Sequence, residues 1–279
     1  MGSDVSIERM PGGVSVAAGG TRTAIKLDRP WQPDIVITPE TCPFCRQADM
    51  ERREFRRIEK GGGWRVINNA FTPFPFHRLI IPFSCWPKEE LRRLGGVEQI
   101  RRVLDIFSEM YAAEKRDELW LTVHIGALAG QNVMHLHFHV QQILGQRAVI
   151  NGTEDYIRAA CPELEVFSDM GLRVVATGHR AGQCLIARAH DAFLKDWENS
   201  FAVVLDRLIG LYATKFRSRQ GLPPDFMLFF GLSSRGPLYA SYVPILNQMG
   251  GPEYLGLLEG TPMIIPWPHA ATAAHLRAG

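Results

Sequence analysis

The chain has 279 residues, of which 46% are hydrophobic and 22% are charged, a composition that excludes a disordered chain, a collagen-like repeat and a disulfide-rich mini-protein. The 31 lysines and arginines nearly balance the 29 aspartates and glutamates, so charge gives no case for a nucleic-acid partner. Apolar runs fall short of the roughly 18 residues of a membrane span, and no secretory signal is visible. Five cysteines in such a chain indicate a reducing, cytoplasmic location.

Strands and helices alternate along the chain after a glycine-rich start. Residues 1–40 are expected to form an irregular arm across the surface. The apolar spacing then predicts two short strands around a glycine turn, a buried strand, a long amphipathic helix and two further strands. In chain order these elements are expected at 54–58, 64–68, 77–83, 97–111, 120–125 and 135–143, with a loop of small residues at 126–131.

The same order of elements recurs about 105 residues later, which indicates an internal duplication. The second group has a strand at 184–188, a helix at 201–212 and strands at 226–230 and 239–246. We therefore expect an α+β fold made by tandem duplication of one unit, over 41–146 and 147–279, with an antiparallel sheet flanked by helices. The Pro- and Ala-rich tail from residue 264 onward is expected to lie on the surface.

Three histidines alternate with apolar residues in the segment QNVMHLHFHVQQ at 131–142. His135, His137 and His139 are expected on one face of a strand, because successive side chains of a strand point to opposite faces. Two kinds of chemistry suit such a row. All three could bind one metal ion, as in catalytic three-histidine zinc sites. Alternatively, one neutral imidazole could attack phosphorus while its neighbours assist.

The residues that precede the histidines carry a family resemblance. The stretch from His124 to Gln131 reads HIGALAGQ, and NVMHLHFHV follows it. Together, the glycine-rich loop, its final Gly-Gln pair and the three spaced histidines resemble the histidine triad superfamily. The resemblance implies that His137 attacks the α-phosphate of a nucleotide and carries the nucleotidyl group covalently. It also implies phosphate contacts for His139, Gln131 and Asn132.

A narrower resemblance covers most of residues 29–258. The segment RPWQ at 29–32 stands ahead of CPFC at 42–45, and VINNAF occupies 66–71. Both segments are similar to parts of the galactose-1-phosphate uridylyltransferase family, which is itself a tandem duplication of the triad fold. The resemblance is strong in the first unit and weak in the second, whose motif region lacks histidine. One active centre per chain is therefore expected.

This narrower resemblance also implies a nucleoside pocket. Asn69, or else its neighbour Asn68, is expected to contact the nucleoside, and His77 is a further candidate for the pocket wall. The implied substrate is a nucleotide or nucleotide sugar, with no nucleic-acid or membrane partner. Because dimers are usual in the families that the chain resembles, a homodimer is one expectation for the assembly.

The same branch implies a structural zinc site. Its members bind zinc through a CxxC pair, a histidine after a P-x-x-H turn and the first histidine of the motif. Here Cys85 stands in place of the turn histidine, and a thiolate is itself a sound zinc ligand. The expected ligands are Cys42, Cys45, Cys85 and His135, which would fix the N-terminal knuckle against the catalytic strand. Unrelated thiols are the alternative interpretation.

Two residues depart from the pattern of the family. His124 stands where the family has an asparagine that steadies the phosphate or the nucleophile, and histidine brings greater size and a titratable charge. His139 stands where uridylyltransferases carry glutamine, as it does in the hydrolase branches. The second departure favours hydrolysis, whereas the length, the duplication and the segment at 29–32 favour transfer.

The leading hypothesis is a nucleotidyltransferase or hydrolase that attacks the α-phosphate of a nucleotide sugar or dinucleoside polyphosphate. His124, His137 and His139 form its expected catalytic set, and no magnesium requirement is expected. Two alternatives stay open. One is a metal-dependent hydrolase that uses all three motif histidines, and the other is a nucleotide-binding protein without catalytic activity.

Overall fold

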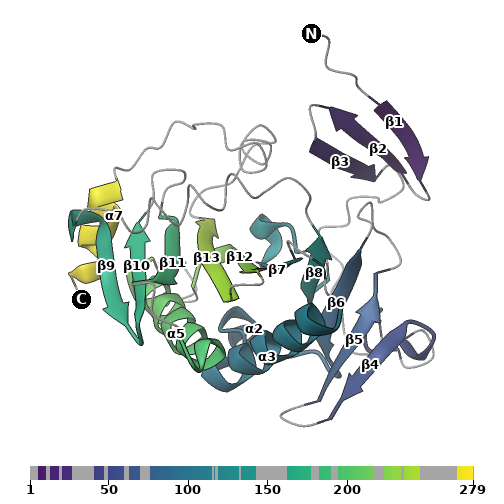
Figure 1. The fold of residues 1–279 in the computed structure, drawn as a ribbon, viewed down its shortest axis with the longest axis horizontal. Helices are drawn as coiled ribbons and strands as arrows, with labels where there is room; N and C mark the ends of the chain where they lie inside the picture. The colour runs from purple at the N-terminus through teal and green to yellow at the C-terminus, as the bar shows by residue number, and fades with distance from the viewer. Residues whose placement is uncertain are drawn as a thin grey trace.

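The computed structural model describes the backbone of most of the two expected units and of three short N-terminal strands (Figure 1). The described residues are 6–10, 13–18, 21–26, 41–46, 50–59, 63–69, 76–114, 116, 119–131, 133–142, 162–176, 182–189, 194–216, 223–233, 236–245 and 269–278. Among them, no helix combines the length and the apolar composition that a membrane crossing requires.

A ten-stranded antiparallel sheet dominates the structure (Figure 1). Across the sheet its strands are β4 (Glu54–Ile58), β5 (Trp64–Asn68), β6 (His77–Pro82), β8 (Phe138–Gln142), β7 (Leu119–Ile125), β12 (Asp225–Ser233), β13 (Gly236–Ile245), β11 (Cys184–Arg188), β10 (Leu172–Ala176) and β9 (Glu165–Asp169). The second five strands repeat the first five in reverse spatial order, so that β7 and β12 meet at the middle. The expected α+β fold with a duplicated unit is confirmed, while the boundaries at residues 41, 146 and 147 stay a prediction.

Two long helices lie side by side against one face of this sheet (Figure 1). They are α3 (Gly96–Glu114) in the first unit and α5 (Trp197–Lys215) in the second, and the short helix α2 (Lys88–Arg92) precedes α3. Each helix buries an apolar stripe, as its spacing predicted. The pairing of the two helices joins the units on this face, as the strand pair β7–β12 joins them within the sheet.

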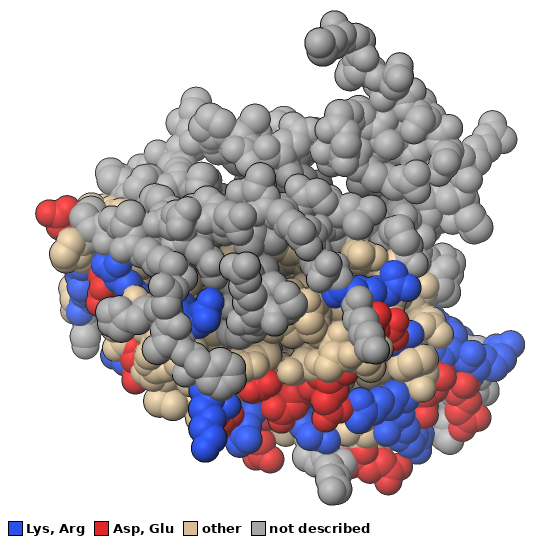
Figure 2. Space-filling model, viewed as in Figure 1, with Lys and Arg blue, Asp and Glu red and all other residues tan. Residues whose placement is uncertain are grey.

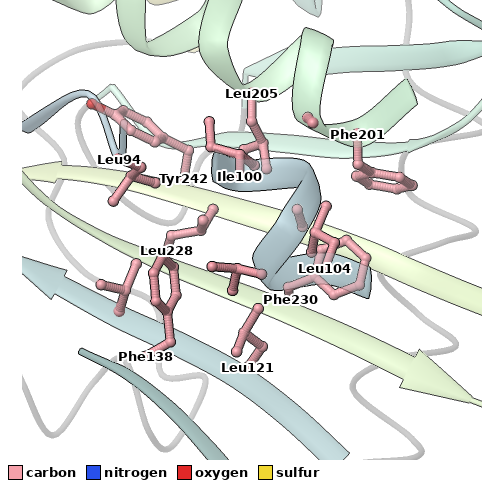
Figure 3. Close-up of a cluster of buried hydrophobic side chains, with 14 of the residues drawn as sticks. Leu94, Ile100, Leu104, Leu121, Phe138, Phe201, Leu205, Leu228, Phe230 and Tyr242 are labelled. Carbon is pink, nitrogen blue, oxygen red and sulfur yellow. The ribbon is translucent and has the colours of Figure 1, made fainter. Parts of the chain in front are cut away.

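The core between sheet and helices is continuous across both units (Figure 3). Leu104 of α3, Phe201 of α5 and Phe230 of β12 are all buried in this one cluster. The rings of Phe201 and Phe230 meet edge to face with centroids 5.0 Å apart, an arrangement that aromatic pairs favour. The two units therefore share one hydrophobic core and do not form separate domains.

The N-terminal segment differs from the expected irregular arm. Its described residues form three antiparallel strands, β1 (Ser6–Met10), β2 (Gly13–Ala18) and β3 (Thr21–Lys26). Gly12 stands between β1 and β2, and Gly19 and Gly20 stand between β2 and β3 in the sequence. Glycines between short alternating runs are hairpin signals. The expectation of an irregular arm rested on the glycines and overlooked the alternation of apolar and polar residues in the three strands.

The C-terminal tail also differs from the expectation. Residues His269–Arg277 form a helix, α7, which contacts β9 and β10 and buries Ala273 and Leu276. Alanine is the strongest helix former, and the segment HAATAAHLR contains four alanines. The tail is thus part of the core of the second unit over these residues and not only a surface segment.

Charged side chains of both signs intermingle over the lower part of the face shown in Figure 2. The described residues of that face therefore present no broad patch of one sign. This distribution agrees with the nearly balanced composition of 31 basic and 29 acidic residues.

Candidate active site

A cavity of about 340 Å³ opens within the first unit. Four of the histidines that the sequence analysis selected line it, His77, His124, His137 and His139, together with Asn69. The other lining residues are Pro43, Phe44, Arg53, Leu79, Thr122, Gly130, Val133 and Gln141. A concave site with a few convergent polar groups and an apolar wall is typical of small-molecule binding.

The backbone fixes the tautomer of His137. Its Nδ1 lies 2.7 Å from the backbone oxygen of His135, and because a carbonyl oxygen can only accept, Nδ1 carries the proton and donates. In the neutral imidazole the lone pair therefore resides on Nε2. This is the arrangement that a nucleophilic histidine requires.

A chain of polar contacts runs from β5 to β8 along the pocket. Nε2 of His77 lies 2.9 Å from Nδ1 of His139, and the side-chain amide nitrogen of Asn69 lies 3.2 Å from the ring of His77. Because β6 pairs with β8 and places Leu79 opposite His139, these side chains come from neighbouring strands. The contacts orient His139 toward the same cavity as His137.

The neighbouring residue His124 is held by the glycine-rich loop over 126–131, which we call the glycine loop. Its Nδ1 donates a hydrogen bond of 2.8 Å to the backbone oxygen of Ala129. Burial lowers the pKa of His124, although that hydrogen bond opposes the shift. A neutral ring with its proton on Nδ1 leaves Nε2 as an acceptor. The neutral ring of His124 therefore has no second N–H to donate.

Three thiols and one imidazole converge on the other side of the histidine segment. Nδ1 of His135 lies 3.5 Å from the sulfurs of Cys42 and Cys45 and 3.3 Å from that of Cys85. The sulfurs of Cys45 and Cys85 are 3.5 Å apart. All four ligand atoms lie within 4.8 Å of one another. Burial is the main cause that raises the pKa of both Cys42 and Cys85.

Comparisons with known proteins fit this geometry. No protein-family model matches the chain, and no curated protein matches its sequence. Among solved structures, the ADP-glucose phosphorylase of Arabidopsis thaliana with bound ADP-glucose matches with a TM-score of 0.63 at 15% identity, over 98% of each chain. A uridylyltransferase matches with a TM-score of 0.61 at 15% identity, over 98% of this chain and 97% of that chain.

A yeast Ap4A phosphorylase also matches, with a TM-score of 0.52 at 14% identity over 95% of this chain and 82% of that chain. The chain shares the fold of these phosphorylase and uridylyltransferase structures. The coverage of nearly the whole chain includes both units. The resemblance inferred from the histidine segment and its glycine loop is thereby confirmed at the level of the fold.

The alternation predicts that the three histidines of the segment line one face of a strand, and the structure differs from this prediction. Strand β8 begins only at Phe138. His135 is fully buried among the thiols, whereas His137 and His139 line the cavity. The cause is the cysteine cluster, which takes the side chain of His135 before pairing with β6 and β7 begins. This separation does not fit the alternative in which all three histidines bind one metal ion.

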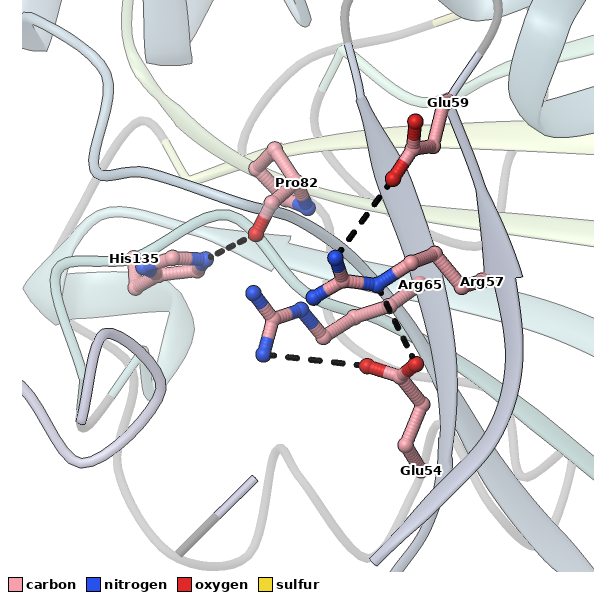
Figure 4. Close-up of polar contacts among 6 residues, drawn as sticks. All are labelled: Glu54, Arg57, Glu59, Arg65, Pro82 and His135. Carbon is pink, nitrogen blue, oxygen red and sulfur yellow. Dashed lines mark hydrogen bonds and ion pairs between the residues drawn. The ribbon is translucent and has the colours of Figure 1, made fainter. Parts of the chain in front are cut away.

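The cluster of Cys42, Cys45, Cys85 and His135 fits a four-coordinate metal site. Zinc–sulfur bonds of about 2.3 Å in a tetrahedron place sulfurs about 3.8 Å apart, close to the separations present here. Nε2 of His135 donates to the backbone oxygen of Pro82 over 3.0 Å (Figure 4), the orienting contact that metal-bound histidines usually make. Burial also lowers the pKa of His135 to about 4, so the ring is a neutral ligand at pH 7.

A buried cation stands near this cluster. Arg65 is only 5% exposed, and Glu54 lies between it and Arg57 (Figure 4). Burial lowers the pKa of Arg65, while the charges of Glu54 and Cys45 oppose that shift. Three thiolates around a divalent cation carry a net charge of −1, which a buried guanidinium offsets.

The remaining expected site residues fall into distinct places. Asn69 lines the cavity, whereas Asn68 is exposed. The side-chain oxygen of Gln131 accepts a hydrogen bond of 2.7 Å from the backbone nitrogen of Gly126, so this end of Gln131 braces the glycine loop. Asn132 lies outside the described residues.

Phe44 and Arg53 are among the residues of the cavity wall that the sequence analysis did not select. Phe44 stands between the two cysteines of the CxxC pair, and its ring centroid lies 5.4 Å from those of both His135 and His137. Arg53 belongs to a run of arginines that favours a solvated face, yet it lines the cavity. Only the position of Phe44 inside the CxxC pair offered a signal; nothing local distinguishes Arg53 from Arg52.

Proposed function

We propose that this protein is a nucleotidyltransferase or nucleotide hydrolase that acts on the α-phosphate of a nucleoside diphospho-compound through a covalent nucleotidyl group on Nε2 of His137. The observation that carries the proposal is the hydrogen bond from Nδ1 of His137 to the backbone oxygen of His135, 2.7 Å long. It sets the nucleophilic tautomer inside a cavity large enough for a nucleotide.

In the first half of the reaction, the lone pair on Nε2 of His137 forms a bond to the α-phosphorus. The bond from phosphorus to the bridging oxygen breaks, and the leaving phosphate or sugar phosphate takes that electron pair. In the second half, an oxygen of the acceptor attacks the same phosphorus and the electron pair returns to Nε2. Dividing one displacement into two is the general strategy of covalent catalysis.

The neighbouring residues supply position and charge. His139, oriented by its contact with His77, is placed to donate to the phosphate oxygens, which gain charge as the displacement proceeds. Asn69 is placed for the ribose or the base. Nε2 of His124 can accept a hydrogen bond, which suits an attacking molecule that carries a proton, such as water. Arg53 adds a positive charge to the wall that a phosphate would face.

The substrate class rests on what the matching structures are named for. They are an ADP-glucose phosphorylase, a uridylyltransferase and an Ap4A phosphorylase. ADP-glucose and Ap4A share an α-phosphate that links a nucleoside to a phosphorylated leaving group. We therefore propose a nucleotide sugar or a dinucleoside polyphosphate as the substrate, and leave the acceptor to experiment.

We further propose that Cys42, Cys45, Cys85 and His135 hold a structural zinc ion. When bound, zinc would fix these four side chains as one rigid unit and take no part in the bond changes. Phe44, which lies between the two cysteines of the pair, would then be held against His137. In this way the knuckle supports the wall of the cavity beside the nucleophile.

The deciding experiment incubates the protein with UDP-, GDP- and ADP-sugars and with dinucleoside polyphosphates. The reaction is quenched under denaturing conditions that are not acidic, and the intact mass is measured. His137→Asn and His275→Asn are compared, because His275 is an exposed histidine on α7. We expect a gain of one nucleoside monophosphate in the wild type and in His275→Asn but not in His137→Asn.

The fate of the adduct separates the two activities. An adduct that persists until phosphate or a sugar phosphate is added identifies a transferase, and one that decays in water identifies a hydrolase. Tight nucleotide binding with neither adduct nor turnover would refute the proposal in favour of a binding protein. Turnover without an adduct would refute the covalent mechanism.

A further inference from the structure

The motif region of the second unit lacks histidine, but a carboxylate of this unit contacts the glycine loop of the first unit. Asp225 begins β12 and is 8% exposed. Its Oδ2 accepts the backbone N–H of Leu128, in the glycine loop, over 2.8 Å. Its Oδ1 accepts from the guanidinium of Arg92, at the end of α2, and Arg92 also donates to the backbone oxygen of Pro223.

The glycine loop is shaped around this carboxylate. Strand β12 pairs with β7 so that Phe226 lies opposite Ile125, which brings Asp225 beside Gly126. Gly126 has a φ of +92°, and a Cβ added there would lie 2.0 Å from the carboxyl carbon of Asp225. The residue is therefore glycine for two reasons, namely its backbone conformation and the space that the carboxylate occupies.

The loop connects this carboxylate to the cavity. Gly130, at the end of the loop, lines the cavity, and the backbone oxygen of Ala129 holds Nδ1 of His124. A shift of the loop would therefore move both the wall and the ring of His124. Since Leu128 lies between Gly126 and Ala129, its hydrogen bond to Asp225 fixes the centre of the loop.

We propose that Asp225 is a positioning residue for the active site of the other unit. Its carboxylate anchors the glycine loop through Leu128, and the ion pair with Arg92 neutralises a charge that would otherwise repel a phosphate. The second unit, although it lacks a motif of its own, is then required to shape the phosphate-binding wall. This inference rests on the proposed function for its kinetic test but not for its structural one.

The test compares Asp225→Asn and Asp225→Ala with Asp206→Asn. Asp206 is a matched control, because it is also an acidic residue of the second unit paired with an arginine of the first, Arg93, at 3.9 Å. Asp206 lies on α5. The rate of nucleotidylation of His137 and its dependence on substrate concentration are measured for each variant, with thermal unfolding and the hydrogen exchange of peptides that contain 126–131.

We expect Asp225→Ala to slow nucleotidylation at saturating substrate by about tenfold or more, since a hydrogen bond to a charged group is lost. Asp225→Asn, which keeps one oxygen acceptor, should be slowed less. In both variants, the peptides of the glycine loop should exchange faster than in the wild type, while the rest of the sheet should exchange at the wild-type rate. Asp206→Asn should match the wild type in rate and in exchange.

Two results would overturn the proposal. One is a rate and a loop exchange in Asp225→Asn equal to those of Asp206→Asn. The other is faster exchange across the whole sheet, because Asp225 would then contribute to stability alone. If the wild type forms no adduct, the proposed function fails, but the exchange of the loop still decides whether Asp225 anchors it. If Asp225→Ala does not fold, Asp225→Asn carries both measurements.

Discussion

Nε2 of His77 and Nδ1 of His139 lie 2.9 Å apart, which joins an imidazole of β6 to one of β8 across neighbouring strands. In the proposed mechanism, the second of these rings contacts the substrate phosphate, and the first orients it. We expect His77→Gln to slow nucleotidylation by about tenfold, the cost of one lost hydrogen bond of about 1.4 kcal/mol. Single-turnover rates with intact-mass detection measure this.

The control for this variant is His275→Gln, since His275 is exposed on α7. Thermal unfolding should show that His77→Gln keeps its fold. A His77→Gln variant that reacts at the wild-type rate would show that His139 needs no such partner.

Metal content tests the cluster of Cys42, Cys45, Cys85 and His135. We expect about one zinc ion per chain by elemental mass spectrometry, and its loss in Cys42→Ser, since a hydroxyl is a poor replacement for a thiolate. A loss of about 2 kcal/mol of stability would lower Tm by about 4–8 °C. Cys184→Ser, which changes another buried thiol, should keep the metal.

Cys85→His provides a sharper version of this test. Because histidine is also a zinc ligand, we expect this variant to keep the metal while Cys85→Ser loses it. Equal zinc content in Cys85→Ser and the wild type would exclude Cys85 from the site.

The dependence of stability on pH tests the environment of His124. Burial lowers its pKa in the folded protein, whereas in the unfolded chain it titrates near 6.5. Below pH 6.5 the unfolded state therefore binds more protons, and this histidine makes the free energy of unfolding fall as pH falls. The slope from one group is at most about 1.4 kcal/mol per pH unit. Urea titrations at pH 7.5, 6.5 and 5.5 measure it.

His124→Asn removes this titration, so its free energy of unfolding should fall less between pH 6.5 and 5.5 than that of the wild type. His275→Asn changes an exposed histidine and should preserve the wild-type slope. Parallel curves for His124→Asn and the wild type would contradict the buried neutral state of His124.

Two glycines differ in the space that is available for a Cβ atom. Gly126→Ala would set a Cβ 2.0 Å from the carboxyl carbon of Asp225 at a φ of +92°. We expect it to destabilise the protein by about 2 kcal/mol or more and to abolish nucleotidylation. A Cβ added at Gly210, in helix α5, would have no heavy atom within 4 Å.

Gly210→Ala should therefore stabilise the protein by about 0.5–1 kcal/mol, since alanine is the better helix former. Thermal unfolding compares the two variants. A Gly126→Ala variant as stable and as active as the wild type would show that the loop can move away from Asp225.

The sequence predicted well whatever depends on local periodicity. Strands β4 and β5 have the expected bounds, and helix α3 extends from 96 to 114 around the expected apolar stripe. The hairpin of β9 and β10 was missed, although its alternating residues flank Gly171, which has a φ of +75°. That glycine, which follows Asp169 and Met170, was an available turn signal.

The sequence selected His137 and His139, which line the cavity, but it did not predict that His135 would separate from them. Three histidines spaced by two predict one row, but the row breaks because Cys42 and Cys85 close around His135 from distant parts of the chain. Such a contact spans 93 residues in the first case, and no local pattern shows it. The placement of Arg53 in the cavity wall depends in the same way on how β4 meets the sheet.

The junction of β7 and β12 lies inside a single polypeptide. In an assembly of two identical chains, every inherited change appears on both sides of the junction at once. Here the two halves can differ, so one half can carry the motif histidines and the other lack them while the sheet stays continuous. The carboxylate of Asp225 could thus specialise in serving its neighbour, an unequal division of labour that two copies of one gene product could not evolve.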